Sequence, residues 1–213
     1  MVAIFVYIVV LFFSGIIHEV SHGYVAYLKG DDTAKMLGRI TLNPILHIEF
    51  FGTVMLPVIL LFLKTPVLFG WAKPVPVNYR NLKNPKVDIP IVSFSGPASN
   101  MLLATMSGLG IYLIRVFPNF ERGFGESIEV FLYLMLTVNT VLSIVNLIPI
   151  PPLDGSKIIT YFLPEKIAIK YLNFNPYVCL GVIFVLISSG IVWRFVCPIV
   201  TFLTAIFGIG AKI

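Results

Sequence analysis

Charged residues are scarce in this sequence, and their scarcity decides the class of protein. Asp, Glu, Lys and Arg together make up 12% of the 213 residues, whereas hydrophobic residues make up 58%. Soluble domains contain about 25% charged residues, and the mean hydropathy of +0.95 lies far outside their range. A soluble fold is therefore excluded, and the sequence predicts a polytopic membrane protein.

Cysteines are also few, and they exclude a disulfide framework or a thiolate metal site. Cys179 and Cys197 both lie in the apolar C-terminal region and lack metal-ligand spacing such as C-x-x-C. The formal charge of +5 comes from basic residues in short loops between apolar runs, where they act as orientation signals. We therefore expect a lipid bilayer as the surroundings and no nucleic-acid partner.

Internal repeats, low-complexity stretches and appended soluble segments are absent as well. We therefore expect one membrane-embedded domain over residues 1–213. The apolar N-terminal run lacks the basic start and the small-residue cleavage site of a signal peptide, so we expect it to be retained.

The motif H-E-x-x-H at residues 18–22 predicts a metal site. On an α-helix, positions i and i+4 share a face, so His18 and His22 can direct an imidazole nitrogen at one ion. Glu19 lies beside them, where a carboxylate can accept a proton from water activated by the metal, as in zinc hydrolases. The alternative is a chance pattern on a surface helix. Ionisable groups that follow the apolar run 2–17 are costly, however, and usually functional.

A second motif lies at residues 146–155, where closely spaced prolines end a predicted helix and present Asp154 from irregular backbone that Gly155 frees. At membrane depth such backbone requires cover by protein or a water-filled cavity. Two histidines need a third protein ligand, and Asp is a common completion for catalytic zinc. The alternative is a solvated aspartate in a Pro-Asp-Gly turn.

We expect an all-α fold with about five transmembrane helices, one re-entrant segment and short β-ribbon elements. Apolar runs predict spans at residues 2–29, 89–117, 128–148, 176–192 and 196–209, the last two joined by a turn near Trp193-Arg194.

Three further segments are expected outside these spans. The apolar run 50–63 is too short to span and is expected to be re-entrant. Residues 33–41 and 71–78 are expected as β elements, either of which could pair with an unwound substrate strand. Residues 156–173 are amphipathic and are expected at the membrane interface.

A shared metal site constrains the topology. If His18, His22 and Asp154 bind one ion, an odd number of crossings separates the two helices that carry them, which makes 50–63 re-entrant. Of the 15 Lys and Arg residues, all except Arg115, Arg122 and Arg194 then lie on the side of the metal. By the positive-inside rule that side is cytoplasmic, and the N-terminus is outside.

With these motifs in view, the chain resembles the site-2 protease family of intramembrane zinc metalloproteases, in the compact prokaryotic form without a PDZ or CBS domain. The resemblance rests on the H-E-x-x-H motif at 18–22, on S-G-P-x-x-N at 95–100 and on N-x-x-P-x-P-P-L-D-G at 146–155. Residues 43–47 and 70–78 also look like stretches found in one branch of the family.

The resemblance implies an endopeptidase that cleaves transmembrane segments of membrane-anchored regulatory or signal proteins. It implies one zinc ion per chain, held by His18, His22 and Asp154, with Glu19 as the general base. Asn146 is similar to the family position proposed to steady the substrate carbonyl or its oxyanion.

Some alternatives stay open. Asn100 suits either the same amide role or an interhelical hydrogen bond, and we favour the hydrogen bond. His47 could replace Asp154 as a ligand, support the site, or be a solvated interfacial histidine. A membrane metal-ion transporter could use the same ligands, but it would gain nothing obvious from Glu19.

Overall fold

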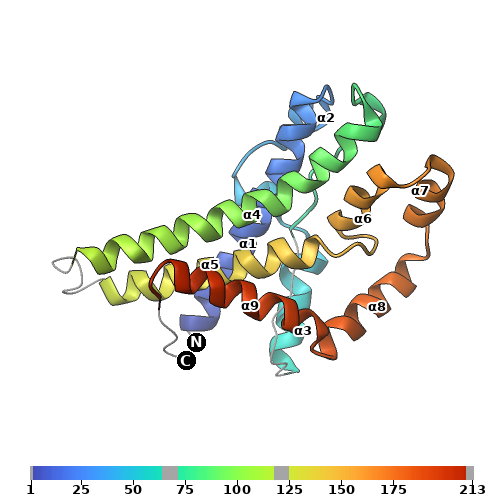
Figure 1. The fold of residues 1–213 in the computed structure, drawn as a ribbon. Coiled ribbons are helices and arrows are strands. Elements are labelled where there is room, and N and C mark those ends of the chain that lie inside the picture. Colours follow the sequence, from blue (N-terminus) through green and yellow to red (C-terminus); the bar gives the residue numbers. More distant parts are fainter. Residues whose placement is uncertain (1, 64–71, 118–124, 210–213) are drawn as a thin grey trace. The chain divides into compact units, whose positions relative to one another are not determined.

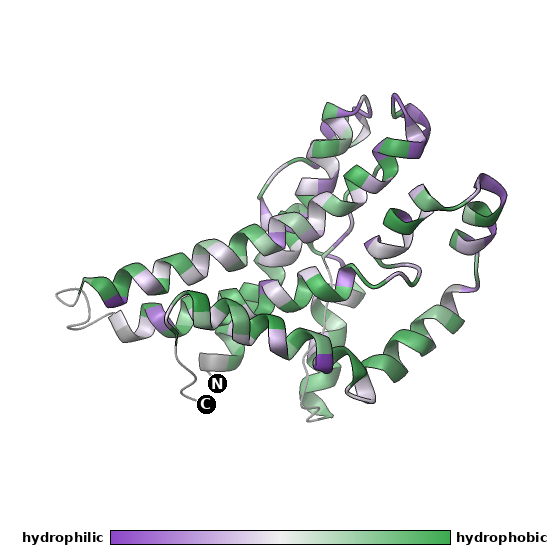
Figure 2. Cartoon of the chain, in the orientation of Figure 1, coloured by the Kyte–Doolittle hydropathy of each residue, from purple (hydrophilic) through white to green (hydrophobic). Residues whose placement is uncertain are grey.

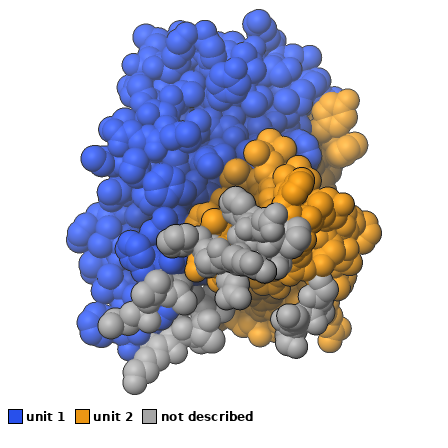
Figure 3. Space-filling model, turned by 90° about the vertical axis from the view of Figure 1, so that its left-hand side faces the viewer, with its two compact units in different colours: residues 1–99 blue, residues 100–213 orange. Residues whose placement is uncertain are grey.

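The structure is a computed structural model that describes residues 2–63, 72–117 and 125–209. Within these residues every regular element is a helix and no strand occurs (Figure 1). The chain divides into two compact units, Met1–Ser99 and Asn100–Ile213 (Figure 3).

The elements follow in chain order. The first unit contains α1 (Val2–Leu28), α2 (Thr33–Met36), η1 (Pro44–His47), η2 (Phe50–Met55), α3 (Leu56–Phe62), η3 (Tyr79–Asn81) and the first part of α4 (Pro85–Val116). The second unit contains the rest of α4, α5 (Glu126–Asn146), α6 (Asp154–Ile159), η6 (Thr160–Phe162), α7 (Glu165–Leu172), α8 (Pro176–Ser188) and α9 (Ile191–Ile206).

In the part of the chain that the structure describes, three helices are long and apolar enough to cross a membrane: Ile4–Leu28, Pro85–Val116 and Ser127–Asn146 (Figure 2). A fourth span results if Glu165–Leu172 and Tyr177–Ser188, bent by 78°, count as one. The helices Phe50–Phe62 and Ile191–Ile206 are apolar but shorter. The all-α membrane class is therefore confirmed, whereas the expected number of about five spans is not.

The β-ribbon elements are not found in the described residues. Residues 33–36 form α2, because the Asp31 side chain accepts the Thr33 N–H at 3.2 Å and starts a helical turn there. Gly38, with φ of 63°, then reverses the chain. Residues 72–78 form no ladder, and Trp71 lies outside the described residues. Pro74 and Pro76 provide no N–H donor for one.

The core of the first unit joins the end of α1 to the start of α4. Buried Ala26, Leu82 and Val92 form a cluster, against which Val77 and Tyr79 pack. A Schellman motif closes α1: the Gly30 N–H donates to Tyr27 O at 3.1 Å, and the Asp31 N–H donates to Ala26 O at 2.9 Å.

Gly30 has φ of 110°, a backbone conformation that favours glycine at the end of a helix. In the same region Lys29 Nζ lies 3.2 Å from Asp88 Oδ1. The end of α1 and the start of α4 are therefore held together by an ion pair as well as by packing.

The core of the second unit lies between α4, α5 and α9. Ile111, Leu136 and Ile209 form its buried cluster, and Phe207 packs over Gly108, where an added Cβ would lie 2.2 Å from the ring. The chain turns between α8 and α9 at Gly190, whose φ is 78°. The expected turn near Trp193-Arg194 is therefore wrong, because only glycine adopts this left-handed backbone without strain.

A buried amide pair links α4 to α5 within the second unit. Asn100 Nδ2 donates to Asn139 Oδ1 at 2.8 Å, and Asn139 Nδ2 donates back to Met135 O at 2.8 Å. Both asparagine side chains have no exposed surface. The interhelical hydrogen bond favoured for Asn100 is confirmed.

This pair should stabilise the second unit measurably. In a double-mutant cycle of Asn100→Ala and Asn139→Ala, we expect a coupling free energy of about 1 kcal/mol, as is typical of interhelical bonds in membranes. Detergent-induced unfolding followed by circular dichroism measures it. The control pair Thr105→Ala and Thr137→Ala should show no coupling, because each hydroxyl bonds within its own helix. Equal coupling in the two cycles would contradict the assignment.

Candidate metal centre

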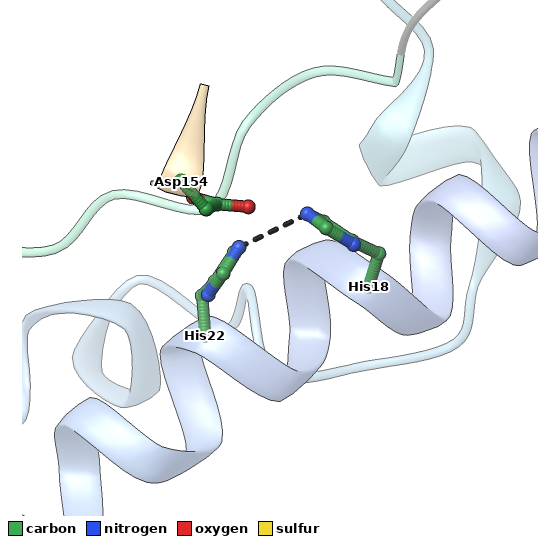
Figure 4. Close-up of side chains that lie close together, drawn as sticks. All are labelled: His18, His22 and Asp154. Carbon is green, nitrogen blue, oxygen red and sulfur yellow. Dashed lines mark hydrogen bonds between the residues drawn. The ribbon is translucent and has the colours of Figure 1, made fainter. Parts of the chain in front are cut away.

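Two histidines of α1 converge on one point. His18 and His22 are one turn apart, and their Nε2 atoms lie 3.1 Å from each other (Figure 4). Their rings are perpendicular, and both side chains are largely buried. Two zinc–nitrogen bonds of about 2.0–2.1 Å at a tetrahedral angle would separate the nitrogens by roughly 3.3 Å. The pair therefore fits two ligands of one zinc ion.

A main-chain carbonyl fixes which nitrogen of His22 is available. Nδ1 of His22 lies 2.7 Å from Val92 O, on the part of α4 that belongs to the first unit. A carbonyl only accepts hydrogen bonds, so Nδ1 carries the proton and the Nε2 lone pair faces His18. Histidine ligands of metals are typically oriented by such a bond to their second nitrogen.

Gly96 makes room for both imidazoles. A Cβ at this position would lie 2.5 Å from His22 Nε2 and 2.6 Å from His18 Nε2. Any side chain there would displace both nitrogens. The glycine of the S-G-P stretch is therefore required sterically, because α4 approaches the histidine face of α1 closely at this position.

The Glu19 carboxylate is held by the main chain of residues 72–78. Its Oε2 accepts the Val75 N–H at 2.9 Å. Val75 reaches α1 because position 23 is glycine, where an added Cβ would lie 2.6 Å from Val75 Cγ1. In the described part of the chain, no other hydrogen bond to this carboxylate is present. One carboxylate oxygen is thus fixed by the main chain.

Asp154 opens helix α6 in the second unit. The backbone before it is irregular, as expected, but Asp154 itself is the first helical residue. Gly155 is required by packing, because its Cβ would lie 2.2 Å from the Leu147 carbonyl oxygen. Lys157 Nζ lies 3.7 Å from Asp154 Oδ1, one turn along the helix. The carboxylate is buried.

The other two predicted residues differ in their surroundings. Asn146 is the last residue of α5, and its Nδ2 donates to Leu142 O at 2.9 Å, which uses one of its two amide protons. His47 is fully buried and bonds through Nε2 to Thr41 O at 2.8 Å, so the alternative of a solvated histidine does not hold.

Sequence reasoning did not find the main-chain partners of the motif. Val92 O and Val75 N–H are backbone groups, and residue type carries no signal for them. Gly23, directly after the second histidine, was a usable signal, because a glycine inside a helix indicates close approach of another segment.

Comparison with known proteins agrees with this geometry. The model of peptidase family M50 matches residues 6–189. The chain belongs to peptidase family M50. It is 38% identical over 171 residues to "Putative zinc metalloprotease YwhC" of Bacillus subtilis, covering 80% of this chain and 74% of that protein.

A more distant relative agrees. The chain is 31% identical over 140 residues to "Putative zinc metalloprotease Rip2" of Mycolicibacterium smegmatis, covering 65% of this chain and 50% of that protein. No solved structure matches significantly. The predicted resemblance is confirmed. With its apolar helices, this M50 member is an intramembrane metalloprotease, and the names of both relatives imply zinc as the metal.

Substitution of Gly96 tests the packing of the histidines. Gly96→Ala should lower zinc content and peptide hydrolysis at least about tenfold, because the new Cβ would overlap both Nε2 atoms. Helix content should not fall, since alanine favours a helix more than glycine. Atomic absorption and circular dichroism measure the two. Gly15→Ala is the control, because its Cβ would lie at an ordinary 3.8 Å from Ala72. Normal zinc content in Gly96→Ala would contradict this account.

Proposed function

We propose that this chain, as a single domain over residues 1–213, cleaves transmembrane segments of membrane-anchored regulatory or signal proteins. The observation that carries the proposal is the convergence of His18 Nε2 and His22 Nε2 at 3.1 Å, beside a Glu19 carboxylate held by a main-chain N–H. One zinc ion per chain suits this donor pair.

Asp154 is the proposed third ligand. A tetrahedral catalytic site takes three protein ligands, and two histidines with one carboxylate form a common set. Asp154 is buried, opens a helix after irregular backbone and belongs to the second motif of the chain. His47 is the alternative ligand; its Nε2 bonds to the Thr41 carbonyl, so only its Nδ1 could bind a metal.

Each residue of the proposed site has one task in peptide hydrolysis. Zinc, when bound, polarises the scissile carbonyl and makes water more acidic. Glu19 accepts a proton from the attacking water and returns it to the leaving amine, as a general base and then a general acid. Asn146 keeps one amide proton with which to stabilise the negative charge that develops on the carbonyl oxygen.

The proposed orientation follows from the distribution of basic residues. Lys29, Lys35 and Arg39 follow His22 by 7, 13 and 17 residues. By the positive-inside rule the site faces the cytoplasmic side and the N-terminus lies outside. A transmembrane substrate must then unwind near that side, because a helix hides its amides from the site.

Replacement of the base gives the first test of this proposal. Glu19→Gln should retain zinc and lose hydrolysis by on the order of a hundredfold or more, because an amide cannot accept the proton. Cleavage of a panel of single-span peptides by the detergent-purified protein, with and without a chelator, measures the loss. Near-normal turnover in Glu19→Gln would remove Glu19 from the mechanism.

The choice of the third ligand gives a second test. Asp154→Ala should lower both zinc content and activity, whereas His47→Ala should leave zinc in place. Metal analysis after purification measures this. The reverse pattern would assign the ligand to His47. Weak, exchangeable binding in the unmodified protein, in place of tight zinc near one per chain, would favour the metal-ion transporter.

A further inference from the structure

Residues 72–78 run beside α1 for about half the length of that helix. Near their start, Ala72 faces Gly15, with 3.8 Å between the alanine Cβ and an ideal Cβ on the glycine. Val75 packs on Gly23, and its N–H bonds to Glu19. The backbone from 72 to 75 is nearly extended. Three residues span at most roughly 10 Å, and the two turns of α1 between Gly15 and Gly23 cover a similar distance.

Two groups hold the first part of this segment. The Lys73 N–H donates to His47 O at 2.8 Å. The carbonyl of the same residue accepts from Arg39 Nη2 at 3.1 Å, and Arg39 Nη2 lies 3.4 Å from Pro74 O. The residues immediately before Val75 are therefore fixed through their backbone atoms, independently of their side chains.

Asp31 holds the end of the segment. Its Oδ2 accepts the Asn78 N–H at 2.6 Å, and its Oδ1 accepts Asn81 Nδ2 at 2.9 Å and the Thr33 N–H at 3.2 Å. The side chain has no exposed surface. Although burial raises its pKa, these hydrogen bonds outweigh burial, and the net pKa lies below the usual value. Asp31 is thus a buried anion whose oxygens point at backbone and amide donors.

Asp31 is itself fixed to the helix that carries Glu19, because its N–H closes the Schellman motif on Ala26 O at 2.9 Å. The segment is therefore attached to α1 at two places. Asn78 bonds to Asp31 at the end of the helix, and Val75 bonds to Glu19 near its middle. Three residues separate Asn78, which bonds to Asp31, from the Val75 N–H that bonds to the Glu19 carboxylate.

We propose that Asp31 is a positioning residue for Glu19, acting through residues 72–78 and the Val75 N–H. This inference rests on the proposed role of Glu19 as the general base. Loss of the Asp31 anchor lets the segment move away from α1, so that the carboxylate is no longer held toward the reacting water. Misplacement by about 1 Å costs as much as a hundredfold in rate.

Asp31→Asn tests this with Asp32→Asn as its matched control. The substitution replaces one carboxylate oxygen, an acceptor, by an NH2 group, which is a donor. This donor then faces either the Asn78 N–H or the donors that bond to Oδ1. Asp32 is exposed, and its side chain makes no cap hydrogen bond. We expect kcat on a single-span peptide to fall at least about tenfold in Asp31→Asn, with KM within about twofold and zinc retained. Asp32→Asn should match the unmodified protein.

The double variant separates positioning from general stability. If Asp31 acts through Glu19, adding Asp31→Asn to Glu19→Gln should change the residual single-turnover rate by less than about twofold. A further tenfold loss there would overturn the inference. So would equal kcat in Asp31→Asn and Asp32→Asn. Normal turnover in Glu19→Gln would instead overturn the proposed function itself.

A second variant keeps the test decisive if Asp31→Asn does not fold. Arg39→Gln removes the hydrogen bond at the other end of the segment, and Arg80→Gln, at an exposed position, is its control. Arg39→Gln should also lower kcat, with KM and zinc unchanged, and the loss should again vanish in the Glu19→Gln background. Normal kcat in Arg39→Gln would overturn the inference.

Discussion

The rest of the structure depends on the cost of placing ionisable side chains in an apolar helix. Inside a membrane protein each of these groups needs an internal partner, since lipid offers none. In α1 the first partners come from main chain: Val92 O for His22 and Val75 N–H for Glu19. Backbone groups satisfy the polar atoms without adding further buried charge. The start of α4 and residues 72–78 therefore have to lie directly against α1.

Such close contact is achieved by glycines at the points of approach. Gly96 and Gly23 each leave space where an added Cβ would come within 2.6 Å of a side-chain atom of another element. Gly155 does the same for the turn before α6. These residues occur within or beside the three motifs of the chain. Each motif thus combines chemical groups with the small residues that let the neighbouring backbone approach them.

Long helices and motif residues could be predicted from the sequence because both depend on local patterns. The apolar run predicted α1 to within one residue of its observed end at Leu28. The β element at 33–41 was not found, because residues 33–36 form a helical turn at Asp31, whose carboxylate accepts bonds from Thr33, Asn78 and Asn81 together. Residue type alone did not indicate that one buried side chain would organise three segments.

The backbone hydrogen bonds that residues 72–78 already make limit how this segment can pair with a substrate. Pro74 and Pro76 have no N–H, while the N–H groups of Lys73, Val75 and Asn78 are used by His47 O, Glu19 and Asp31. The carbonyls of Lys73 and Pro74 lie within bonding distance of Arg39. Strand addition needs a row of unused donors and acceptors. These bonds leave fewer backbone groups of the segment for an unwound substrate strand, the partner that the extended pattern in the sequence had suggested.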